Sequence, residues 1–343
     1  MQQVWIPRTG SPDVLELREA PDPTPDPGAV RVRVHAAGIN FADILARMGL
    51  YPDAPPIPCV VGYEVSGVID AVGDGVDPTR IGQRVVAMTR FGGYASSICV
   101  PEKQAVPLAD SISFHDAAAI PVVWLTAWIM LVRLGNLQKG ERVLIHSAGG
   151  GVGLAAVQIA KWRGAEIFGT ASPGKHERLR EYGVHHCIDY RSQNFADEVE
   201  RITDGRGVHL IIDAVGGRSF RDSYRSLAPM GRLFCFGVST MAPGEKRSIF
   251  AALKGLFAMP RFAPIPLMQQ NRGVFGVNLG QMWDLADELA EILREVLEGV
   301  EDGRFHAVVD TTFAAADASD AHRYIQDRRN FGKVVLTFDH DAS

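Results

Sequence analysis

A glycine-rich stretch, Ala148–Gly153, has the composition of a phosphate-binding turn. Its residues match the G-x-G-x-x-G pattern with alanine in the first position, and they lie between an apolar run, Arg142–His146, and a helix-like segment, Val152–Trp162. In that context Gly150 lets the backbone approach a pyrophosphate, Gly153 lets the helix pack closely, and the helix N-terminus offers free N–H groups. A turn without a ligand is the alternative. The pattern predicts a dinucleotide held by Ala148, Gly149, Gly150, Gly151, Val152 and Gly153.

The end of the next predicted strand distinguishes NAD from NADP. An acid about 20 residues after the glycine motif would bind the ribose 2′-hydroxyl and repel a 2′-phosphate. The sequence there is Gly169-Thr170-Ala171-Ser172, without an acid. Lys175 follows, and its ammonium can act as a point charge on a phosphate, although it could instead be a solvated helix residue. The sequence therefore predicts NADPH.

The cysteines and histidines do not suggest a metal site. None of Cys59, Cys99, Cys187 and Cys235 pairs at C-x-x-C spacing or lies close to a histidine in a zinc-ligand pattern. We expect four reduced thiols, mostly packed, and no metal. Among the ten histidines, His146 is expected to be a satisfied polar residue at a strand end.

The elements that position these residues form two domains. A chain of 343 residues exceeds one ordinary core, and its 46% hydrophobic and 22% charged residues are typical of a globular protein. Residues 1–118 contain short alternating runs such as Val30–His35, separated by stretches rich in proline and glycine. This pattern predicts a small β-barrel or sandwich.

From about residue 119, apolar strands alternate with helical segments, which predicts a parallel sheet wound on both faces. An amphipathic helix near 285–296 follows, and then a strand near 307–309, a helix over 315–328 and a strand over 334–338. We expect this tail to rejoin the first domain, so that residues 1–118 and 280–343 form one domain and residues 119–279 the other. The predicted strands of the second domain are 142–146, 166–170, 187–189, 210–213 and 233–237.

Charge and hydropathy exclude other classes of function. The net charge is −5 and no basic block stands out, so no nucleic-acid partner is expected. No apolar stretch reaches the roughly 20 residues of a spanning helix. Residues 1–5 lack the basic and apolar regions of a signal peptide, which predicts a cytoplasmic protein.

Further motifs occur in order along the chain: Ala37–Asp43, Gly62–Val68, Gly82–Val85, Ala117–Pro121, Asp213–Gly217 and Asn330–Val334. With the phosphate turn, they resemble the medium-chain dehydrogenase/reductase superfamily, specifically its zinc-free quinone oxidoreductase branch. Val274–Leu279 and Ala321–Gln326 look most like the vesicle amine transport protein-like reductases. The resemblance implies an α/β fold with a GroES-like β-barrel domain and a Rossmann doubly wound parallel sheet.

The resemblance also implies positions around NADPH. Asn40 and Thr126 would lie near the nicotinamide, and Ser172, Lys175 and Tyr190 would surround the 2′-phosphate. For Tyr190 simple core packing is the alternative, and for Asn40 a bond to its own backbone. The rest of the cofactor site would comprise Thr170, Val215, Gly237, Phe275, Val277, Asn330 and Lys333.

Zinc members of the superfamily carry a ligating cysteine and the histidine of a Gly-His-Glu motif. This sequence has Asn40 and Tyr63 at those positions, and it lacks the four closely spaced cysteines of the structural zinc lobe. An amide and a phenol do not replace a thiolate and an imidazole at a tetrahedral zinc site. We therefore expect chemistry without a metal.

A quinone or an α,β-unsaturated carbonyl suits such chemistry, because it accepts hydride and spreads the charge over a conjugated system. The predicted function is an NADPH-dependent oxidoreductase that transfers hydride to such a substrate. In related enoyl reductases a tyrosine in the corresponding stretch has a catalytic role, and here that stretch contains Tyr51. Tyr51 would stabilise the negative charge that develops on the substrate oxygen. The alternative is that Tyr51 only caps a loop. Asn40 is the second candidate, and Asp43 would orient these groups. The alternatives are an enoyl-thioester reductase and a non-catalytic NADPH-binding regulatory protein.

Two apolar segments concern substrates and partners. Residues 246–268 form an apolar insertion that could be a lid, a partner or membrane surface, or a local core; the sparse charge argues against a membrane. The short segment Gly273–Val277 matches an edge strand of the Rossmann sheet. Because an unpaired edge is a liability, we expect a homodimer through these edge strands.

Overall fold

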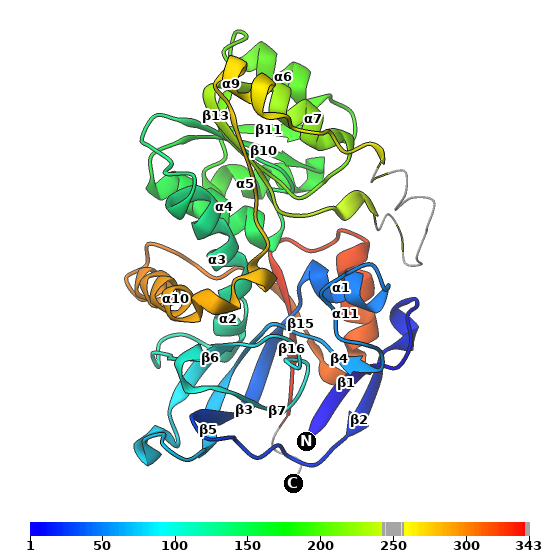
Figure 1. The fold of residues 1–343 in the computed structure, drawn as a ribbon, viewed down its shortest axis with the longest axis vertical. Coiled ribbons are helices and arrows are strands. Elements are labelled where there is room, and N and C mark those ends of the chain that lie inside the picture. Colours follow the sequence, from blue (N-terminus) through cyan, green and yellow to red (C-terminus); the bar gives the residue numbers. More distant parts are fainter. Residues whose placement is uncertain (242–243, 245–254, 256, 340–343) are drawn as a thin grey trace. The chain divides into compact units, whose positions relative to one another are not determined.

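The computed structural model describes residues 1–241, 244, 255 and 257–339. They divide into two compact units (Figure 1). The first contains Met1–Leu125 and the chain from Leu279 onward, and the second contains the chain from Thr126 to Asn278, apart from Gly244, which belongs to the first. The sequence placed these boundaries after residues 118 and 279, and the units divide after Leu125 and Asn278.

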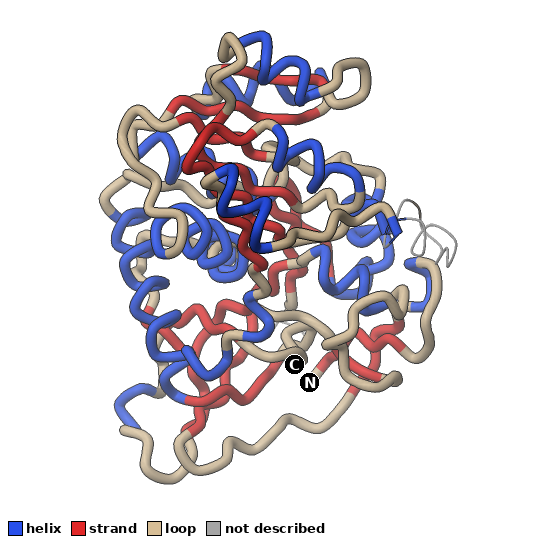
Figure 2. The backbone as a smooth tube through the Cα atoms, turned by 45° about the horizontal axis from the view of Figure 1, so that its top comes forward, coloured by secondary structure: helices blue, strands red, loops and turns tan. Residues whose placement is uncertain are grey.

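The first unit is built mainly on antiparallel strands. These are β1 (Gln2–Ile6), β2 (Glu16–Glu19), β3 (Ala29–Gly38), β4 (Cys59–Val60), β5 (Glu64–Val72), β6 (Arg84–Met88), β7 (Ser97–Pro101), β8 (Ala105–Pro107), β15 (Val309–Ala314) and β16 (Lys333–Thr337). One sheet has the order β15-β16-β3-β5-β6-β8, with β7 also paired to β3, and a smaller sheet has the order β2-β1-β4. Strands β15 and β16 come from the C-terminal part of the chain, and β16 pairs with β3 in the larger sheet (Figure 1). Figure 2 draws the strands of both units in red and their helices in blue.

The alternation of apolar and polar residues along β3 explains why this strand lies in the sheet with one face toward the core. Val30, Val32 and Val34 are fully buried in the core, whereas Arg31 and Arg33 point to the other face. Four α-helices of this unit are α1 (Phe41–Arg47), α2 (Phe114–Ala118), α10 (Ala286–Glu301) and α11 (Ala318–Gln326). Helix α10 buries most of the predicted apolar stripe, but Leu285 precedes the helix and is 49% exposed.

The second unit is a parallel sheet with helices packed around it. Its strands are β9 (Arg142–Ile145), β10 (Glu166–Ala171), β11 (His186–Asp189), β12 (Val208–Asp213), β13 (Leu227–Cys235) and β14 (Gly273–Gly276). They follow the order β11-β10-β9-β12-β13-β14, and every pair is parallel. This is the 3-2-1-4-5-6 order of a dinucleotide-binding sheet, in which ligands bind at the carboxyl ends of the strands beside the switch point between β9 and β12. The predicted Rossmann sheet is confirmed.

The helices described in this unit are α4 (Gly151–Trp162), α5 (His176–Tyr182), α6 (Phe195–Ile202), α7 (Arg218–Arg225) and α9 (Pro264–Gln270), while α3 (Pro121–Trp128) spans the boundary. Helix α5 ends at Gly183, whose φ of 109° is left-handed and favours glycine. The sheet core consists of strand residues such as Leu144, Phe168 and Ile211. Strand β14 lies at the edge of the sheet, as expected for Gly273–Val277.

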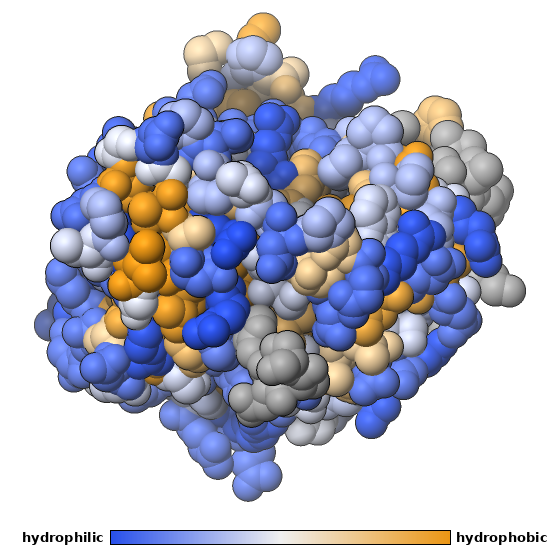
Figure 3. Space-filling view, turned by 90° about the horizontal axis from the view of Figure 1, so that it is seen from below, coloured by the Kyte–Doolittle hydropathy of each residue, from blue (hydrophilic) through white to orange (hydrophobic). Residues whose placement is uncertain are grey.

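No helix among the described residues is long and apolar enough to cross a membrane. The face shown in Figure 3 is mostly hydrophilic, with apolar side chains gathered mainly in one strip. Of the expected apolar insertion over 246–268, residues 246–254 and 256 lie outside the described residues. In the remainder, Phe257, Ile265 and Met268 are 63–85% exposed, whereas Phe262 packs against the sheet core.

Candidate cofactor and active site

The glycine-rich turn connects β9 to α4. The backbone turns at Ser147, whose φ of 55° is left-handed, and the N–H of Ala148 donates to the carbonyl of Thr170 at 3.0 Å. Helix α4 starts from Gly150 as its N-cap. A Cβ atom on Gly153 would lie 2.4 Å from the Ser147 carbonyl oxygen, so the turn needs glycine there. The geometry is that of a helix N-terminus that presents backbone N–H groups to a phosphate.

The expected 2′-phosphate residues follow two neighbouring strands. Ser172 comes directly after β10, Lys175 ends the 3-10 turn that follows it, and Tyr190 comes directly after β11. The parallel register pairs Ala171 with Asp189, so these residues lie at the same edge of the sheet. Tyr190 is 38% exposed, which argues against simple core packing.

Arg191 was missed in the sequence. Its guanidinium lies 6.0 Å from the centre of the Tyr190 ring, and its backbone N–H donates to Asp189. It therefore adds a cation beside Tyr190. Its place two residues after β11, the third strand of the Rossmann order, was the available signal.

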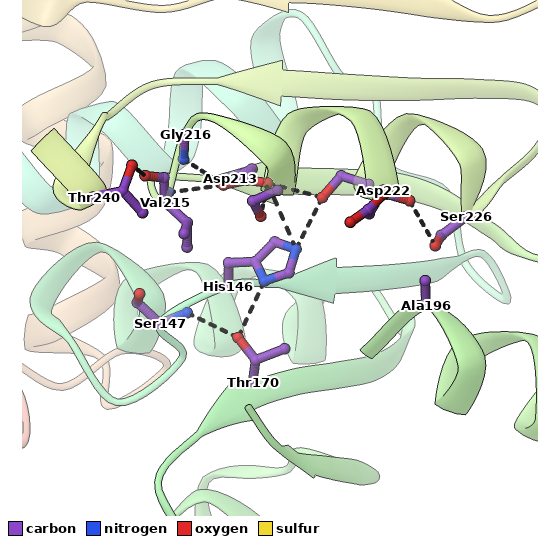
Figure 4. A network of polar contacts seen from close by, with 12 residues as sticks. His146, Ser147, Thr170, Ala196, Asp213, Val215, Gly216, Asp222, Ser226 and Thr240 are labelled. Atoms are coloured by element: carbon purple, nitrogen blue, oxygen red, sulfur yellow. Dashed lines mark hydrogen bonds and ion pairs between the residues drawn. The ribbon is translucent and has the colours of Figure 1, made fainter. Parts of the chain in front are cut away.

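A buried polar network occupies the switch point (Figure 4). His146, at the end of β9, bonds Thr170 on one side and Ser223 on the other, which confirms it as a satisfied polar residue. The Thr170 hydroxyl also accepts the N–H of Ser147, so this expected cofactor residue supports the phosphate turn from inside. Asp213, at the end of β12, accepts the N–H of Val215 at 2.7 Å.

The remaining expected residues of the second unit lie as follows. Thr240 donates its hydroxyl to the carbonyl of Val215. A Cβ atom added to Gly237 would lie 3.1 Å from Ala214, so the chain at Gly237 lies close to Ala214. Phe275 stacks on Phe234 and is 37% exposed, Val277 is buried, and Thr126 is buried in α3.

In the first unit, Asn40, Glu64 and Lys333 form a buried polar cluster. The Lys333 ammonium donates to Glu64 Oε1 at 2.6 Å, to Asn40 Oδ1 at 2.8 Å and to the carbonyl of Ile39 at 2.7 Å. Asn40 Nδ2 donates to the same Glu64 oxygen, and the other carboxylate oxygen accepts the N–H of Val122. The three hydrogens of the ammonium thus have three protein acceptors, so Lys333 fixes the Asn40 amide. Glu64 was missed as a member of this cluster.

Asp43 is a second buried hub beside Asn40. Its carboxylate accepts the N–H of Asn40 at 2.8 Å, the N–H of Gly62 at 3.1 Å and the hydroxyl of Tyr94 at 3.1 Å. Complete burial raises the pKa of Asp43 to about 7, although these hydrogen bonds and the Lys333 charge oppose the shift. The geometry suits the orienting role expected for Asp43.

The Asp43 hub extends to His322 through the Tyr94 hydroxyl, which lies 3.1 Å from His322 Nε2. Burial raises the pKa of Tyr94 and lowers the pKa of His322, so both side chains are neutral at physiological pH. Neither residue was singled out as a site residue from the sequence.

Tyr51 follows α1 in a loop and is half-buried. Its ring meets that of Tyr63 edge-on with centroids 6.4 Å apart, and Tyr63 also contacts Phe91 at 5.0 Å. Tyr63 is buried, and burial raises the pKa of its phenol. Asn330 donates its amide to the carbonyl of Gly332, just before β16.

Comparison with known proteins agrees with this geometry. Residues 26–110 match the alcohol dehydrogenase GroES-like domain family, and residues 182–336 match the zinc-binding dehydrogenase family. The human synaptic vesicle membrane protein VAT-1 homolog is 36% identical over 323 residues, which cover 94% of this chain and 82% of that protein. The chain belongs to the medium-chain dehydrogenase/reductase superfamily.

Two solved structures with similar folds belong to reductases. The Escherichia coli quinone oxidoreductase complexed with NADPH has a TM-score of 0.87 and 28% identity, and the match covers 98% of this chain and 100% of that chain. The CurK enoyl reductase has a TM-score of 0.85 and 30% identity, with coverage of 98% and 99%. This oxidoreductase of the medium-chain superfamily therefore has quinone oxidoreductase and enoyl reductase neighbours.

The name of the matched zinc-binding family raises the question of a metal. Within the part of the chain that the structure describes, no group of three or more His, Cys, Asp or Glu side chains could hold a metal ion. At the positions that resemble those of zinc ligands, the Asn40 amide is bonded to Glu64 and Lys333, and Tyr63 presents a phenol whose pKa is raised by burial. These donors do not fit a tetrahedral zinc ion.

Proposed function

We propose that this medium-chain reductase uses NADPH to reduce a quinone or an α,β-unsaturated carbonyl without zinc. The observation that carries the proposal is the glycine turn at the β9–β12 switch point, followed by a β10 end that has a serine and a lysine in place of an acid. A carboxylate at that position would repel a 2′-phosphate. NADPH, when bound, supplies the hydride.

The second unit would hold the cofactor. Within the turn Ala148–Gly153, the N–H groups at the start of α4 would bind the pyrophosphate, because those of Ala148 and Gly150 donate to protein carbonyls. Ser172, Lys175, Tyr190 and Arg191 would bind the 2′-phosphate. Two cations near one phosphate explain a preference for NADPH over NADH. Val215, Gly237, Phe275 and Val277 at the carboxyl ends of β12, β13 and β14 would line the remaining contacts.

The first unit would supply polar groups for the substrate and the nicotinamide. The Tyr51 hydroxyl would stabilise negative charge on the substrate oxygen. Asn40 would present its amide in an orientation held by Glu64 and Lys333, and Asp43 would hold the Asn40 backbone. Lys333 and Glu64 are therefore positioning residues in this proposal.

The test is oxidation of NADPH, followed by its absorbance, with a quinone, a short enone and an enoyl thioester. We expect turnover with the quinone or the enone, weaker binding of NADH, and no loss of rate after treatment with a zinc chelator. Absence of turnover with all three acceptors despite tight NADPH binding would favour the non-catalytic NADPH-binding protein. Equal affinity for NADH would overturn the cofactor assignment.

Tyr51→Phe tests the substrate side of the proposal. Removal of one hydrogen-bond donor to the developing charge is expected to lower kcat by roughly 10²-fold, with little change in the affinity for NADPH. Tyr190→Phe is the matched control, because it removes a phenol hydroxyl from the second unit and should alter cofactor binding and not kcat. Full kcat in Tyr51→Phe on every acceptor would remove Tyr51 from the mechanism.

Reduction of an enoyl thioester is the second candidate, favoured by the fold similarity to the CurK enoyl reductase. A carrier-linked substrate has a long phosphopantetheine arm, and its phosphate needs cations for recognition. A kcat/KM for a crotonyl thioester that exceeds the value for every quinone and enone would favour this alternative.

We also propose that the protein forms a homodimer through β14. This short strand lies at the edge of the sheet, and exposed apolar side chains accompany it on the same unit, including Phe275 and Met230, which is 81% exposed. Exposed apolar surface beside an unpaired edge favours pairing with a second copy. Light scattering should give a mass near twice 37.3 kDa, and a monomeric mass would refute the proposal.

A further inference from the structure

A continuous chain of hydrogen bonds crosses the switch point of the second unit (Figure 4). It runs from the N–H of Ser147 to the Thr170 hydroxyl at 3.2 Å, and from there to His146 Nδ1 at 3.2 Å. On the other side, His146 Nε2 lies 3.0 Å from the Ser223 hydroxyl, which donates to Asp213 Oδ2 at 2.8 Å. His146 is therefore the central member, with the phosphate turn at one end.

The other end of the chain is the turn after β12. Asp213 Oδ1 accepts the N–H groups of Val215 at 2.7 Å and Gly216 at 3.4 Å, and Oδ2 also accepts the Ser219 hydroxyl at 2.6 Å. Four donors thus converge on one carboxylate that is completely buried. This arrangement holds the backbone of the turn 214–217 against the end of the strand.

The directions of these bonds follow from the number of hydrogens. The Ser223 hydroxyl has one hydrogen, which it gives to the carboxylate, so toward His146 it can only accept. Nε2 of His146 must therefore carry a hydrogen. Burial lowers the pKa of His146, which keeps the ring neutral and leaves Nδ1 as an acceptor for the Thr170 hydroxyl. Each bond in the chain then has one donor and one acceptor.

Burial and packing hold the ring in this orientation. His146 is 3% exposed, its backbone N–H donates to Ile212 on β12, and its ring meets Phe195 of α6 edge-on at 4.5 Å. A ring that is held on all sides transmits a displacement of one turn to the other, because the interior is closely packed.

We propose that His146 is a positioning residue that couples the phosphate turn 147–153 to the turn 214–217 and thereby presets both for the dinucleotide. The assignment of a dinucleotide to these turns rests on the function proposed above. The coupling of the turns does not, because it belongs to the protein alone. When the turns are already ordered before binding, less conformational entropy is lost as the dinucleotide binds.

Two amide substitutions separate the two halves of the chain. In His146→Asn the side-chain oxygen can take the place of Nδ1 and accept from Thr170, while the bond to Ser223 is lost. In His146→Gln the amide nitrogen can take the place of Nε2 and donate to Ser223, while the bond to Thr170 is lost. The two variants therefore release opposite turns.

Hydrogen exchange of the protein without cofactor gives the first measurement. In His146→Gln we expect the amides of 147–153 to exchange about tenfold faster, which corresponds to about 1.4 kcal/mol, and the amides of 215–216 to exchange faster by a smaller factor, because the ring that joins the two turns is gone. An unchanged rate at 215–216 would show that the turns are not coupled. In His146→Asn the pattern should be reversed. Thr170→Val and Ser223→Ala should reproduce the two patterns, and they carry the test if a histidine variant does not fold.

NADPH affinity gives the second measurement. Each His146 variant should raise the Kd for NADPH and its KM about five- to tenfold and leave kcat close to the wild-type value. The control is His209→Gln, which removes an acceptor for the N–H of Arg142 at the amino ends of β9 and β12. This control should leave both turns and the Kd unchanged.

The outcomes separate the coupling from the proposed function. A wild-type protein that binds no dinucleotide would refute the proposed function, while the two exchange patterns would still support or overturn the coupling. Faster exchange spread evenly over the sheet, or an equal loss of affinity in His209→Gln, would show that His146 only stabilises the fold. Identical patterns in His146→Asn and His146→Gln would also overturn the inference.

Discussion

Substitution of Lys333 by methionine tests the polar cluster of the first unit. The ammonium of Lys333 lies 2.6 Å from Glu64, and the two side chains are 5% and 0% exposed. Methionine keeps much of the length of the side chain but removes the cation, so the Glu64 carboxylate would remain buried with only the Asn40 amide and the Val122 N–H. Breaking a buried ion pair on one side costs about 3 to 5 kcal/mol.

For a unit of this size, 1 kcal/mol corresponds to about 2–4 °C in Tm, so the variant should unfold about 6 to 20 °C below the wild type. Scanning calorimetry or thermal circular dichroism measures this directly. Lys103→Met is the matched control, because Lys103 pairs with Asp287 at 2.8 Å with both side chains largely exposed. That substitution should leave the Tm unchanged.

A double-mutant cycle separates the ion pair from general loss of packing. Glu64→Gln alone leaves the cation buried, whereas Glu64→Gln with Lys333→Met leaves no charge in the cluster. The double variant should be more stable than the sum of the two single changes by about 1 to 3 kcal/mol. A Lys333→Met protein that melts within about 2 °C of the wild type, or single effects that simply add, would refute the role assigned to this pair.

Two other predictions concern Asp43 and Gly153. Burial raises the pKa of Asp43 from 3.8 to about 7. The contribution of this group to the free energy of unfolding is therefore fully present below about pH 4 and is lost as the pH rises through 7, by about 4 kcal/mol in total. Urea unfolding from pH 4 to 8 should show this fall in the free energy of unfolding in the wild type and not in Asp43→Asn. Gly153→Ala places a Cβ 2.4 Å from the Ser147 carbonyl oxygen, so the turn must open and the Kd for NADPH should rise more than tenfold; an unchanged Kd in a titration would contradict the role of this turn.

The Rossmann sheet could be predicted because its signals are local. Each strand is a short apolar run, such as Val143-Leu144-Ile145 in β9, whose residues are all completely buried. The glycine turn joins β9 to α4 within a few residues, so strand, turn and helix are read as one unit. The strand ends were less accurate: β13 stops at Cys235 instead of Gly237, because the backbone leaves the ladder before the glycine.

The polar clusters of the first unit could not be predicted, because their members are far apart in the sequence. Glu64 lies 24 residues from Asn40, and Lys333 lies 293 residues from it. No spacing pattern connects such residues, and the fold alone brings them together. Helix α1 is similar: its seven residues are too few for a clear period, and Asp43 holds its N-terminus through contacts to Gly62 and Tyr94.

Buried carboxylates solve the same physical problem in both units. Asp43 collects three hydrogen-bond donors and Asp213 collects four, and two donors at each are backbone N–H groups of a turn or a helix start. A carboxylate only accepts hydrogen bonds, so it can fix several N–H groups at once and has no hydrogen of its own that needs an acceptor. The turns are then ordered when the protein folds, so ligand binding does not have to offset the loss of conformational entropy that ordering them requires. This explains why so much of the buried charge lies beside the loops assigned to cofactor and substrate, where an apolar core would have been more stable but would have left those loops free to move.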